Sequence, residues 1–231
     1  MIDFNKLEEK LGVKVKNKYI WSEALTHNSW LYFHPEAAKD SKHNERLEFL
    51  GDAVLELIVS QVLYKKCPNK EEGELTLIRA NLVNRERLTQ IARKLELENF
   101  LMAGKNLNGK GFDTVLGNCL EALIGAMYLD IGFQDTLDFI NKNLLNDIDE
   151  KIKAKTYKDP KSNLQEILQE ELGVLPEYKI LSEEGPAHKR RFKIGLFLNG
   201  KLIEEGSGLS KQEAETDAAL KVFEKESWKK I

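Results

Sequence analysis

Apolar positions recur at spacings of three and four through most of the first 150 residues, which is the pattern of helices with one buried face. The pattern runs through SEALTHNSWLYF, ERLEFLGDAVLELIVSQVLY, TLIRANLVNRERLTQIARKL, NCLEALIGAMYLD and FQDTLDFINKNLL. We find no convincing strand pattern between these stretches. The sequence therefore predicts an all-α domain over residues 1–150.

The pattern changes in the segment DEKIKAKTYKDPK, which is charged and poor in large apolar residues, as is typical of a solvated connection. We take residues 151–158 as a linker. Beyond it, SNLQEILQEEL has helical spacing, PEYKILSEE, KRRFKIGLFL and KLIEEGSG are strand-like, and SKQEAETDAALKVFEKE is helical again. The dipeptide Asn199–Gly200 predicts a hairpin between the last two strands. Residues 159–231 should thus form an α+β domain of order α-β-β-β-α.

Composition supports a globular protein of two unequal domains, because 231 residues exceed the usual single-domain size and 42% are hydrophobic. No stretch is long and apolar enough for a membrane span, and the N-terminus lacks a signal-peptide pattern, so we expect a cytoplasmic protein without membrane contact. Cys67 and Cys119 are expected to be reduced and structural, and His27 and His43, each alone in its segment, to have structural or surface roles. The net charge of −3 restricts any nucleic-acid site to a local patch.

One helical segment, HNERLEFLGDAVLEL, carries four acids on a single stripe, with an aromatic residue, Phe49, beside them. The acids are Glu45, Glu48, Asp52 and Glu56. Such neighbours repel one another by a few tenths of a kcal/mol each in water. The stripe is either a solvated face, as is common on surface helices, or a set of oxygen ligands for a cation such as Mg²⁺.

A second segment, VLGNCLEALIGAMYLD, favours the cation. Glu121 is the only acid inside its apolar part, where a carboxylate is costly unless it is paired or bound to a metal. Asn118 lies one turn earlier, and Gly125 would allow another backbone to approach closely. If the two helices face each other, Glu48 and Asp52 meet these residues. Such a cluster suits metal-assisted hydrolysis of a phosphodiester.

These motifs resemble a known family. HNERLEFLGDA closely resembles the signature of ribonuclease III, the double-stranded-RNA endonuclease, and EALIGAMYLD resembles its second acidic motif. EALTHNSW, EEGELT and LIRANLVNRERL are similar to further family segments, and the resemblance extends through the second domain. It implies metal-coordinating, catalytic carboxylates at Glu48, Asp52 and Glu121, and further cleft acids at Glu45 and Glu72. Glu56 matches no family ligand and is expected to be solvated.

The resemblance also implies cofactor, partners and products. The cofactor would be Mg²⁺, for which Mn²⁺ could substitute. The chain would form a homodimer through the signature helix, with Phe49 packed into the partner, so that two acidic clusters lie along one RNA duplex. Products would carry 5′-phosphate and 3′-hydroxyl ends with short 3′ overhangs. Processing of ribosomal-RNA precursors and decay of messenger RNA are the implied roles.

One position departs from the family pattern, since Asn118 stands where an aspartate is usual. Its amide oxygen can bind Mg²⁺ but brings no negative charge. Three explanations stay open: a natural variant with weaker metal affinity, an inactivating substitution made for study, or a lineage that binds RNA without cutting well. The alternative function is thus a duplex-RNA-binding regulatory or assembly protein. Because all three carboxylates remain, we expect an active enzyme with Asn118 as a fourth ligand.

The second domain resembles the double-stranded-RNA-binding domain, which spans about 16 base pairs. The expected RNA contacts are Ser162, Gln165 and Glu166 in its first helix, Gly185, Pro186, Ala187 and His188 in a loop, and Ser210 and Lys211 at the last helix. The family usually clusters more lysines at that helix, so binding should be weaker and less salt-dependent here. The run Lys189, Arg190 and Arg191 could compensate, or could simply keep a strand edge soluble.

Overall fold

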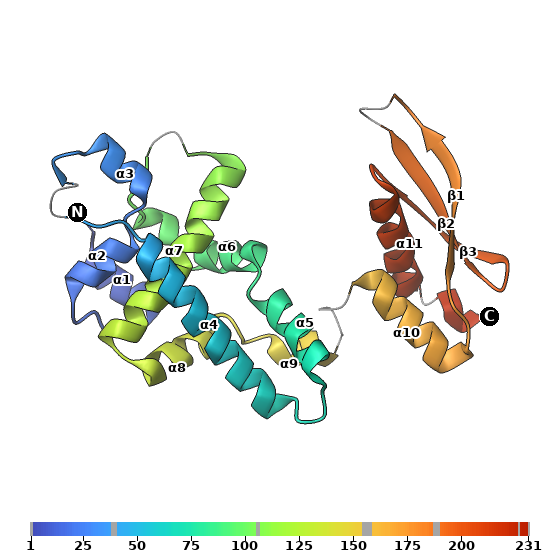
Figure 1. Ribbon diagram of the computed structural model, residues 1–231, viewed down its shortest axis with the longest axis horizontal. Helices are drawn as coiled ribbons and strands as arrows, with labels where there is room; N and C mark the ends of the chain where they lie inside the picture. The colour runs from blue at the N-terminus through green and yellow to red at the C-terminus, as the bar shows by residue number, and fades with distance from the viewer. Residues whose placement is uncertain are drawn as a thin grey trace. The chain divides into compact units, whose positions relative to one another are not determined.

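The computed structural model describes residues 2–37, 41–104, 107–153, 159–186, 190–225 and 227–230. The chain divides into two units, Met1–Glu150 and Lys151–Ile231 (Figure 1). Of the predicted linker, residues 151–153 form the last turn of a helix, and residues 154–158 lie outside the described ranges.

The first unit is helical, as predicted. Its elements are α1 (Phe4–Leu11), α2 (Lys18–Ala24), α3 (Asn28–Phe33), α4 (Glu45–Lys66), α5 (Glu72–Leu82), α6 (Arg85–Lys94), the 3-10 turn η2 (Leu97–Asn99), α7 (Gly109–Asp130) and α8 (Phe133–Asn143). A last helix, α9 (Ile148–Lys153), begins in this unit and continues past its end at Glu150. In the described ranges of this unit, the β-type pairing is limited to one isolated bridge between Thr26 and Met102.

Two of the helical stretches read from the sequence are broken into pairs of helices by capping residues. The His27 side chain accepts a hydrogen bond from the Ser29 amide at 3.3 Å and begins α3. Asn84 does the same for the Arg87 amide at 2.9 Å and begins α6. A side-chain acceptor satisfies an amide that has no partner in the first turn, so a new helix can start in another direction without loss of periodicity.

The first unit is built around α4 and α7, which lie side by side in Figure 1 and pack closely. A Cβ atom on Gly51 of α4 would lie 1.7 Å from the carbonyl oxygen of Glu121, and one on Gly125 of α7 would lie 2.3 Å from that of Leu47. Only glycine fits at either position, because both obstacles are backbone. This approach places the turn of α4 that holds Glu48 beside α7.

The buried face of α4 differs in part from the one expected opposite the acids, where a helical count places Leu47, Leu50, Val54 and Leu57. Leu47 and Val54 are buried, but Leu57 is 59% exposed, while Leu55 and Ile58 are fully buried. Besides α7, the helices α5 and α8 also pack against α4. The buried arc is therefore turned away from the position opposite the acids.

The second unit is a three-stranded antiparallel sheet with two helices on one face (Figure 1). Its elements are α10 (Pro160–Leu172), β1 (Glu177–Glu184), β2 (Arg191–Leu198), β3 (Lys201–Gly208), α11 (Lys211–Lys225) and the 3-10 turn η4 (Ser227–Lys230). The β2–β3 hairpin turns at Asn199 and Gly200, whose φ values of 48° and 79° are those of the predicted tight turn. Leu164 of α10, Leu196 of β2 and Ala218 of α11 share the core. The α+β expectation is confirmed.

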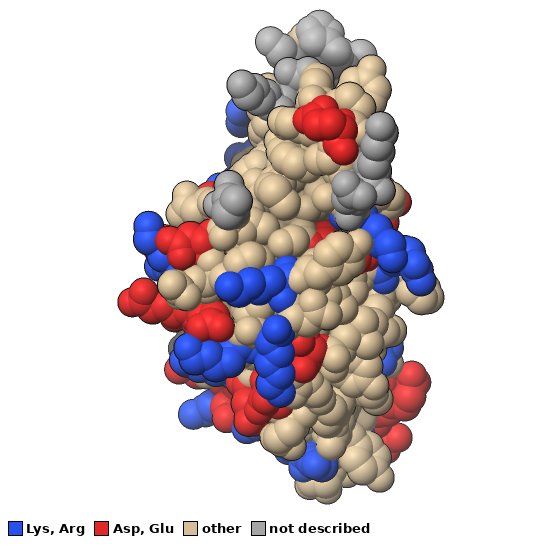
Figure 2. All heavy atoms as spheres, turned by 90° about the vertical axis from the view of Figure 1, so that its left-hand side faces the viewer, with Lys and Arg blue, Asp and Glu red and all other residues tan. Residues whose placement is uncertain are grey.

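The surface contains both signs of charge. On the described residues of the face in Figure 2, acidic and basic side chains are interspersed with uncharged ones, and neither sign covers a broad area. Among the helices in the described ranges, none has the length and apolar character needed to cross a membrane. The mixed charge of this face agrees with a local rather than a general site for a polyanion.

Candidate functional site

The approach of α4 to α7 brings together four polar side chains named from the sequence. Glu48 and Asp52 lie one turn apart on α4, and Asn118 and Glu121 lie nearly one turn apart on α7. The Asn118 amide donates a hydrogen bond to the Glu48 carboxylate, and Glu121 is close enough to both α4 acids to be repelled by them. We call Glu48, Asp52 and Glu121 the acid cluster; Asn118 borders it.

Burial and mutual repulsion make negative charge costly at Glu48 and Glu121. Burial, with added repulsion from Asp52 and Glu48, raises the pKa of Glu121 to about 7. Burial also raises the pKa of Glu48, although the hydrogen bond from Asn118 opposes this. Without a cation, Glu121 is therefore partly protonated at neutral pH, and a bound cation would favour its ionised form.

The donor atoms of this site are carboxylate and amide oxygens, which hard divalent cations prefer. In the described ranges, no three His, Cys, Asp or Glu side chains form a ready-made metal cage. Mg²⁺ needs no such cage, because it is usually held by one or two carboxylates together with water and substrate phosphate oxygens. The oxygen donors present fit a cation whose remaining ligands would be water and substrate phosphate oxygens.

The two further acids named from the sequence are exposed and lie outside the acid cluster. Glu45 accepts a hydrogen bond from Asn28 at 2.7 Å, and its negative charge contributes to the raised pKa of Glu48, one turn away. Glu72, the first residue of α5, accepts a hydrogen bond from Thr76 at 3.0 Å. Glu45 therefore borders the site, whereas the hydrogen bond described for Glu72 stays within its own helix.

The two histidines, which appear isolated in the sequence, are neighbours in the structure. Burial lowers the pKa of His27, the charge of Glu45 opposes that shift, and His43 adds to it. The Nδ1 atom of His43 lies 3.8 Å from a carboxylate oxygen of Glu45. Since His27 also caps α3, its role here is structural, as the sequence indicated.

Arg85, the first residue of α6, is not among the candidate site residues named from the sequence, yet it lies beside the acid cluster. Its positive charge lowers the pKa of both Glu48 and Glu121. This proximity arises because α6 packs on α7, a contact between segments that no local spacing reveals.

In the second unit, the first predicted contact region is exposed on α10. Ser162, Gln165 and Glu166 line a shallow hollow together with Leu175. In the loop after β1, Gly185 and Pro186 are exposed, and Gly185 has a φ of 92° that favours glycine. The remaining two loop contacts, Ala187 and His188, lie outside the described residues.

The third predicted contact region lies at the start of α11, where two backbone amides already donate hydrogen bonds to side chains. Ser210 Oγ accepts a hydrogen bond from the Glu213 amide at 3.1 Å, and Glu213 Oε2 accepts one from the Leu209 amide at 2.7 Å. The pair is similar to a capping box, except that Glu213 accepts a hydrogen bond from the Leu209 amide and not from that of Ser210. Lys211 lies 3.9 Å from Glu183 but keeps 57% of its side chain exposed, so its ammonium group is accessible to a phosphate.

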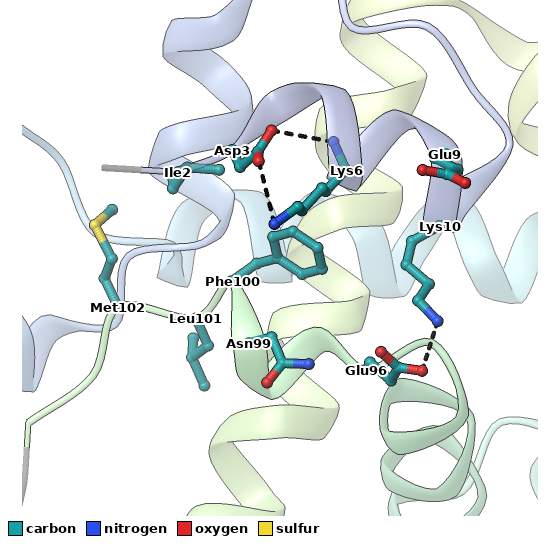
Figure 3. A pocket seen from close by; sticks show the side chains of 10 residues that line it. All are labelled: Ile2, Asp3, Lys6, Glu9, Lys10, Glu96, Asn99, Phe100, Leu101 and Met102. Atoms are coloured by element: carbon teal, nitrogen blue, oxygen red, sulfur yellow. Dashed lines mark hydrogen bonds and ion pairs between the residues drawn. The ribbon is translucent and has the colours of Figure 1, made fainter.

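A separate hollow lies between α1 and the segment 96–102 (Figure 3). Four of its charged side chains form ion pairs, since Asp3 contacts Lys6 at 3.7 Å and Lys10 contacts Glu96 at 2.5 Å. No residue of the acid cluster lines this hollow, so it is not part of the candidate site.

Comparison with known proteins agrees with both units. Residues 17–148 match the family model described as Ribonuclease-III-like, and residues 160–226 match the double-stranded RNA binding motif. The chain is 43% identical to Ribonuclease 3 of Carboxydothermus hydrogenoformans, covering 94% of this chain and 93% of the relative. It is also 43% identical to Ribonuclease 3 of Campylobacter fetus subsp. fetus, with 97% and 98% covered.

Solved structures match the first unit. One crystal structure of the nuclease domain of ribonuclease III from Campylobacter jejuni is 36% identical, has a TM-score of 0.55, and covers 64% of this chain and 97% of that one. A second, which describes flexibility in a region involved in dimer formation, is 38% identical with a TM-score of 0.53, covering 61% and 98%.

A helical nuclease unit followed by a duplex-binding unit defines an endoribonuclease that acts on double-stranded RNA. Its two units match their family models in the order expected from the sequence, and its relatives match over nearly their whole length. The chain belongs to the ribonuclease III family.

Proposed function

We propose that this chain hydrolyses phosphodiesters of double-stranded RNA with Mg²⁺ held by Glu48, Asp52 and Glu121, and with the Asn118 amide oxygen as a further ligand. The observation that carries the proposal is the half-buried Glu121 carboxylate, whose pKa is raised to about 7 beside two other acids. When bound, Mg²⁺ would lower the pKa of a water molecule and offset charge on the phosphate.

Each side chain of the site would have its own role. Glu48 is oriented by the hydrogen bond from Asn118, and Glu121 can exchange a proton at its carboxylate near neutral pH. Glu48, Asp52 and Glu121 would be the catalytic residues, with Glu45 and Glu72 as more distant acids. Products with 5′-phosphate and 3′-hydroxyl ends, substitution by Mn²⁺, the two processing roles and a cytoplasmic location stay predictions from the family resemblance.

Asn118→Asp tests the ligand set. The substitution adds a negative charge and should lower the Mg²⁺ concentration for half-maximal cleavage by about three- to tenfold, in keeping with the dependence of cation affinity on ligand charge. The measurement is cleavage of a labelled RNA duplex across a Mg²⁺ titration. Asn141→Asp, which adds the same charge at an exposed position of α8, should behave like the parent.

The same titration distinguishes the alternative function. If the parent binds the duplex without cutting it and only Asn118→Asp cuts, the chain as it stands is a duplex-RNA-binding protein. Equal Mg²⁺ requirements for parent and variant would remove Asn118 from the ligand set.

A homodimer through α4 is the second part of the proposal. Phe49 is 80% exposed on α4, and the hollow beside it is bounded by Ile20, Leu50 and Leu129. An exposed phenyl ring next to an apolar hollow is self-complementary, since in a two-fold pair each ring can fill the partner's hollow. One similar structure, described as concerning dimer formation of a nuclease domain, supports dimerisation in general.

Phe49→Asp should therefore convert a dimer into a monomer and lower cleavage by at least about tenfold, because a buried charge without a partner is strongly unfavourable. Sedimentation equilibrium measures the assembly, and the duplex assay measures activity. Tyr64→Asp, at a 76% exposed position of α4 that does not line the hollow, is the control. A Phe49→Asp protein that stays dimeric would contradict this interface.

Removal of residues 159–231 should weaken duplex binding by more than about tenfold and leave the single-turnover rate on saturating RNA within a few-fold, because phosphate contacts supply most of the affinity. Binding and single-turnover cleavage by the full chain and by residues 1–158 provide the comparison. Unchanged affinity after truncation would show that the second unit does not hold the duplex.

A further inference from the structure

Arg85 is fixed beside the candidate site by its backbone. It begins α6 directly after the capping residue Asn84. A Cβ atom on Gly117 of α7 would lie 3.7 Å from the Arg85 carbonyl oxygen and 3.2 Å from Thr89 Oγ1. The first turn of α6 therefore packs on the part of α7 immediately before Asn118. A rigid helix start, rather than a loop, presents this arginine.

The side chain of Arg85 is free to bind a ligand. It is exposed, and it forms no hydrogen bond or ion pair within the part of the chain that the structure describes. The two other arginines of α6 are held by carboxylates, Arg87 by Asp147 and Arg93 by Asp113. Five guanidinium N–H donors of Arg85 thus remain available.

The position of Arg85 relative to the acid cluster is informative. Its charge acts on both Glu48 and Glu121, yet it pairs with neither. If the arginine served only to offset the negative charge of these acids, a direct, bidentate ion pair with one of them would be the most favourable arrangement. Arg85 instead stands at the edge of a group of three acids that would otherwise repel an approaching RNA backbone.

We propose that Arg85 binds a backbone phosphate of the RNA strand that lies over the acid cluster, and thereby positions the bond to be cut. The planar, permanently charged guanidinium fork matches two phosphate oxygens. The inference rests on the proposed function for the site, since it assumes that duplex RNA reaches the acid cluster. Arg85 would attract the RNA phosphates that the acids repel.

The test measures binding in proteins that do not cut. In a Glu121→Gln background with Mg²⁺ present, Arg85→Gln should reduce the slope of log affinity against log salt by about 0.7 to 0.9, the value for one lost phosphate contact. Arg85→Lys should retain the slope, because the charge is kept. Lys94→Gln removes one exposed positive charge from the other end of α6 and should leave the slope unchanged.

An unchanged slope for Arg85→Gln, or an equal change for Lys94→Gln, would overturn the proposal. A second measurement separates the competing role as a counter-ion. If Arg85 only offsets the acids, Arg85→Gln with Glu121 intact should need less Mg²⁺ for cleavage and keep the parental salt slope. The phosphate role predicts a lower salt slope. Because Arg85 acts on both acids, the Mg²⁺ requirement should fall in either role, so the salt slope separates the two.

This result is distinguishable from failure of the proposed function. The salt slope is read from binding alone, so it reports on Arg85 whether or not the parent cleaves RNA. Thermal unfolding of Arg85→Gln should match that of the parent, since the side chain is exposed and unpaired, and a matching melt assigns any change in slope to the RNA contact.

Discussion

Glu121→Gln should abolish cleavage while leaving duplex binding nearly intact. The amide has the size of the carboxylate but lacks its charge, so the rate should fall by at least about 1000-fold, or roughly 4 kcal/mol of transition-state stabilisation. Single-turnover cleavage at saturating Mg²⁺ measures the loss. Glu56→Gln is the matched control, because Glu56 lies on the same stripe of α4 and is exposed.

Full activity of Glu121→Gln would remove Glu121 from the catalytic residues. Loss of binding together with activity would instead indicate a damaged fold, which a melting curve would detect. Neither result is expected, because glutamine preserves the volume of the side chain and its carboxamide can still accept hydrogen bonds.

The same substitution has an effect on stability whose sign follows from the pKa. The folded protein holds the Glu121 proton more tightly than the ordinary value of 4.5 allows, up to about 7. The stability that this group contributes is therefore fully present below pH 4.5 and is lost as pH rises through about 7. Without metal, Glu121→Gln should be more stable than the parent at pH 8, by on the order of 1–2 kcal/mol after allowance for partial exposure.

Thermal unfolding in a chelator at pH 5 and pH 8 measures this difference, and added Mg²⁺ should reduce it at pH 8. An identical pH dependence of parent and Glu121→Gln would mean that the pKa of Glu121 is not raised in the metal-free protein.

Gly51→Ala should strongly destabilise the first unit, because an added Cβ meets a closer backbone atom there than at any other described glycine. Its new methyl group would stand 1.7 Å from the Glu121 carbonyl oxygen, and since that obstacle is backbone, α4 and α7 must move apart. We expect a loss of about 3 kcal/mol or more in the free energy of unfolding. Because the same contact holds Glu48 beside Glu121, cleavage should be lost as well.

Urea unfolding of parent and variant measures the first effect. Gly73→Ala is the matched control: it lies in α5, and its Cβ would meet no atom within 4 Å. It should stabilise the protein by about 0.5–1 kcal/mol, as alanine does in an open helical position. A Gly51→Ala protein as stable as the parent would refute the close helix contact.

The arrangement of elements could largely be predicted from the chain. Helical periodicity indicated the first unit, and alternation with the Asn199–Gly200 turn indicated the sheet. Where prediction failed, the competing interaction is visible. His27 and Asn84 break continuous periodic stretches by capping new helices, and Leu57 is exposed because neighbouring helices determine which arc of α4 is buried.

The sequence by itself determined the element types and the order of the two units, and it indicated the acids proposed for the site, because periodicity, turn chemistry and an acid within an apolar helix are local properties. The tertiary structure decided which charges meet. Burial, together with repulsion from Asp52 and Glu48 across the α4–α7 contact, raises the pKa of Glu121, and the packing of α6 on α7 brings Arg85 to the same place. Electrostatic interaction depends on distance in space and on burial, and neither can be read from separation along the chain.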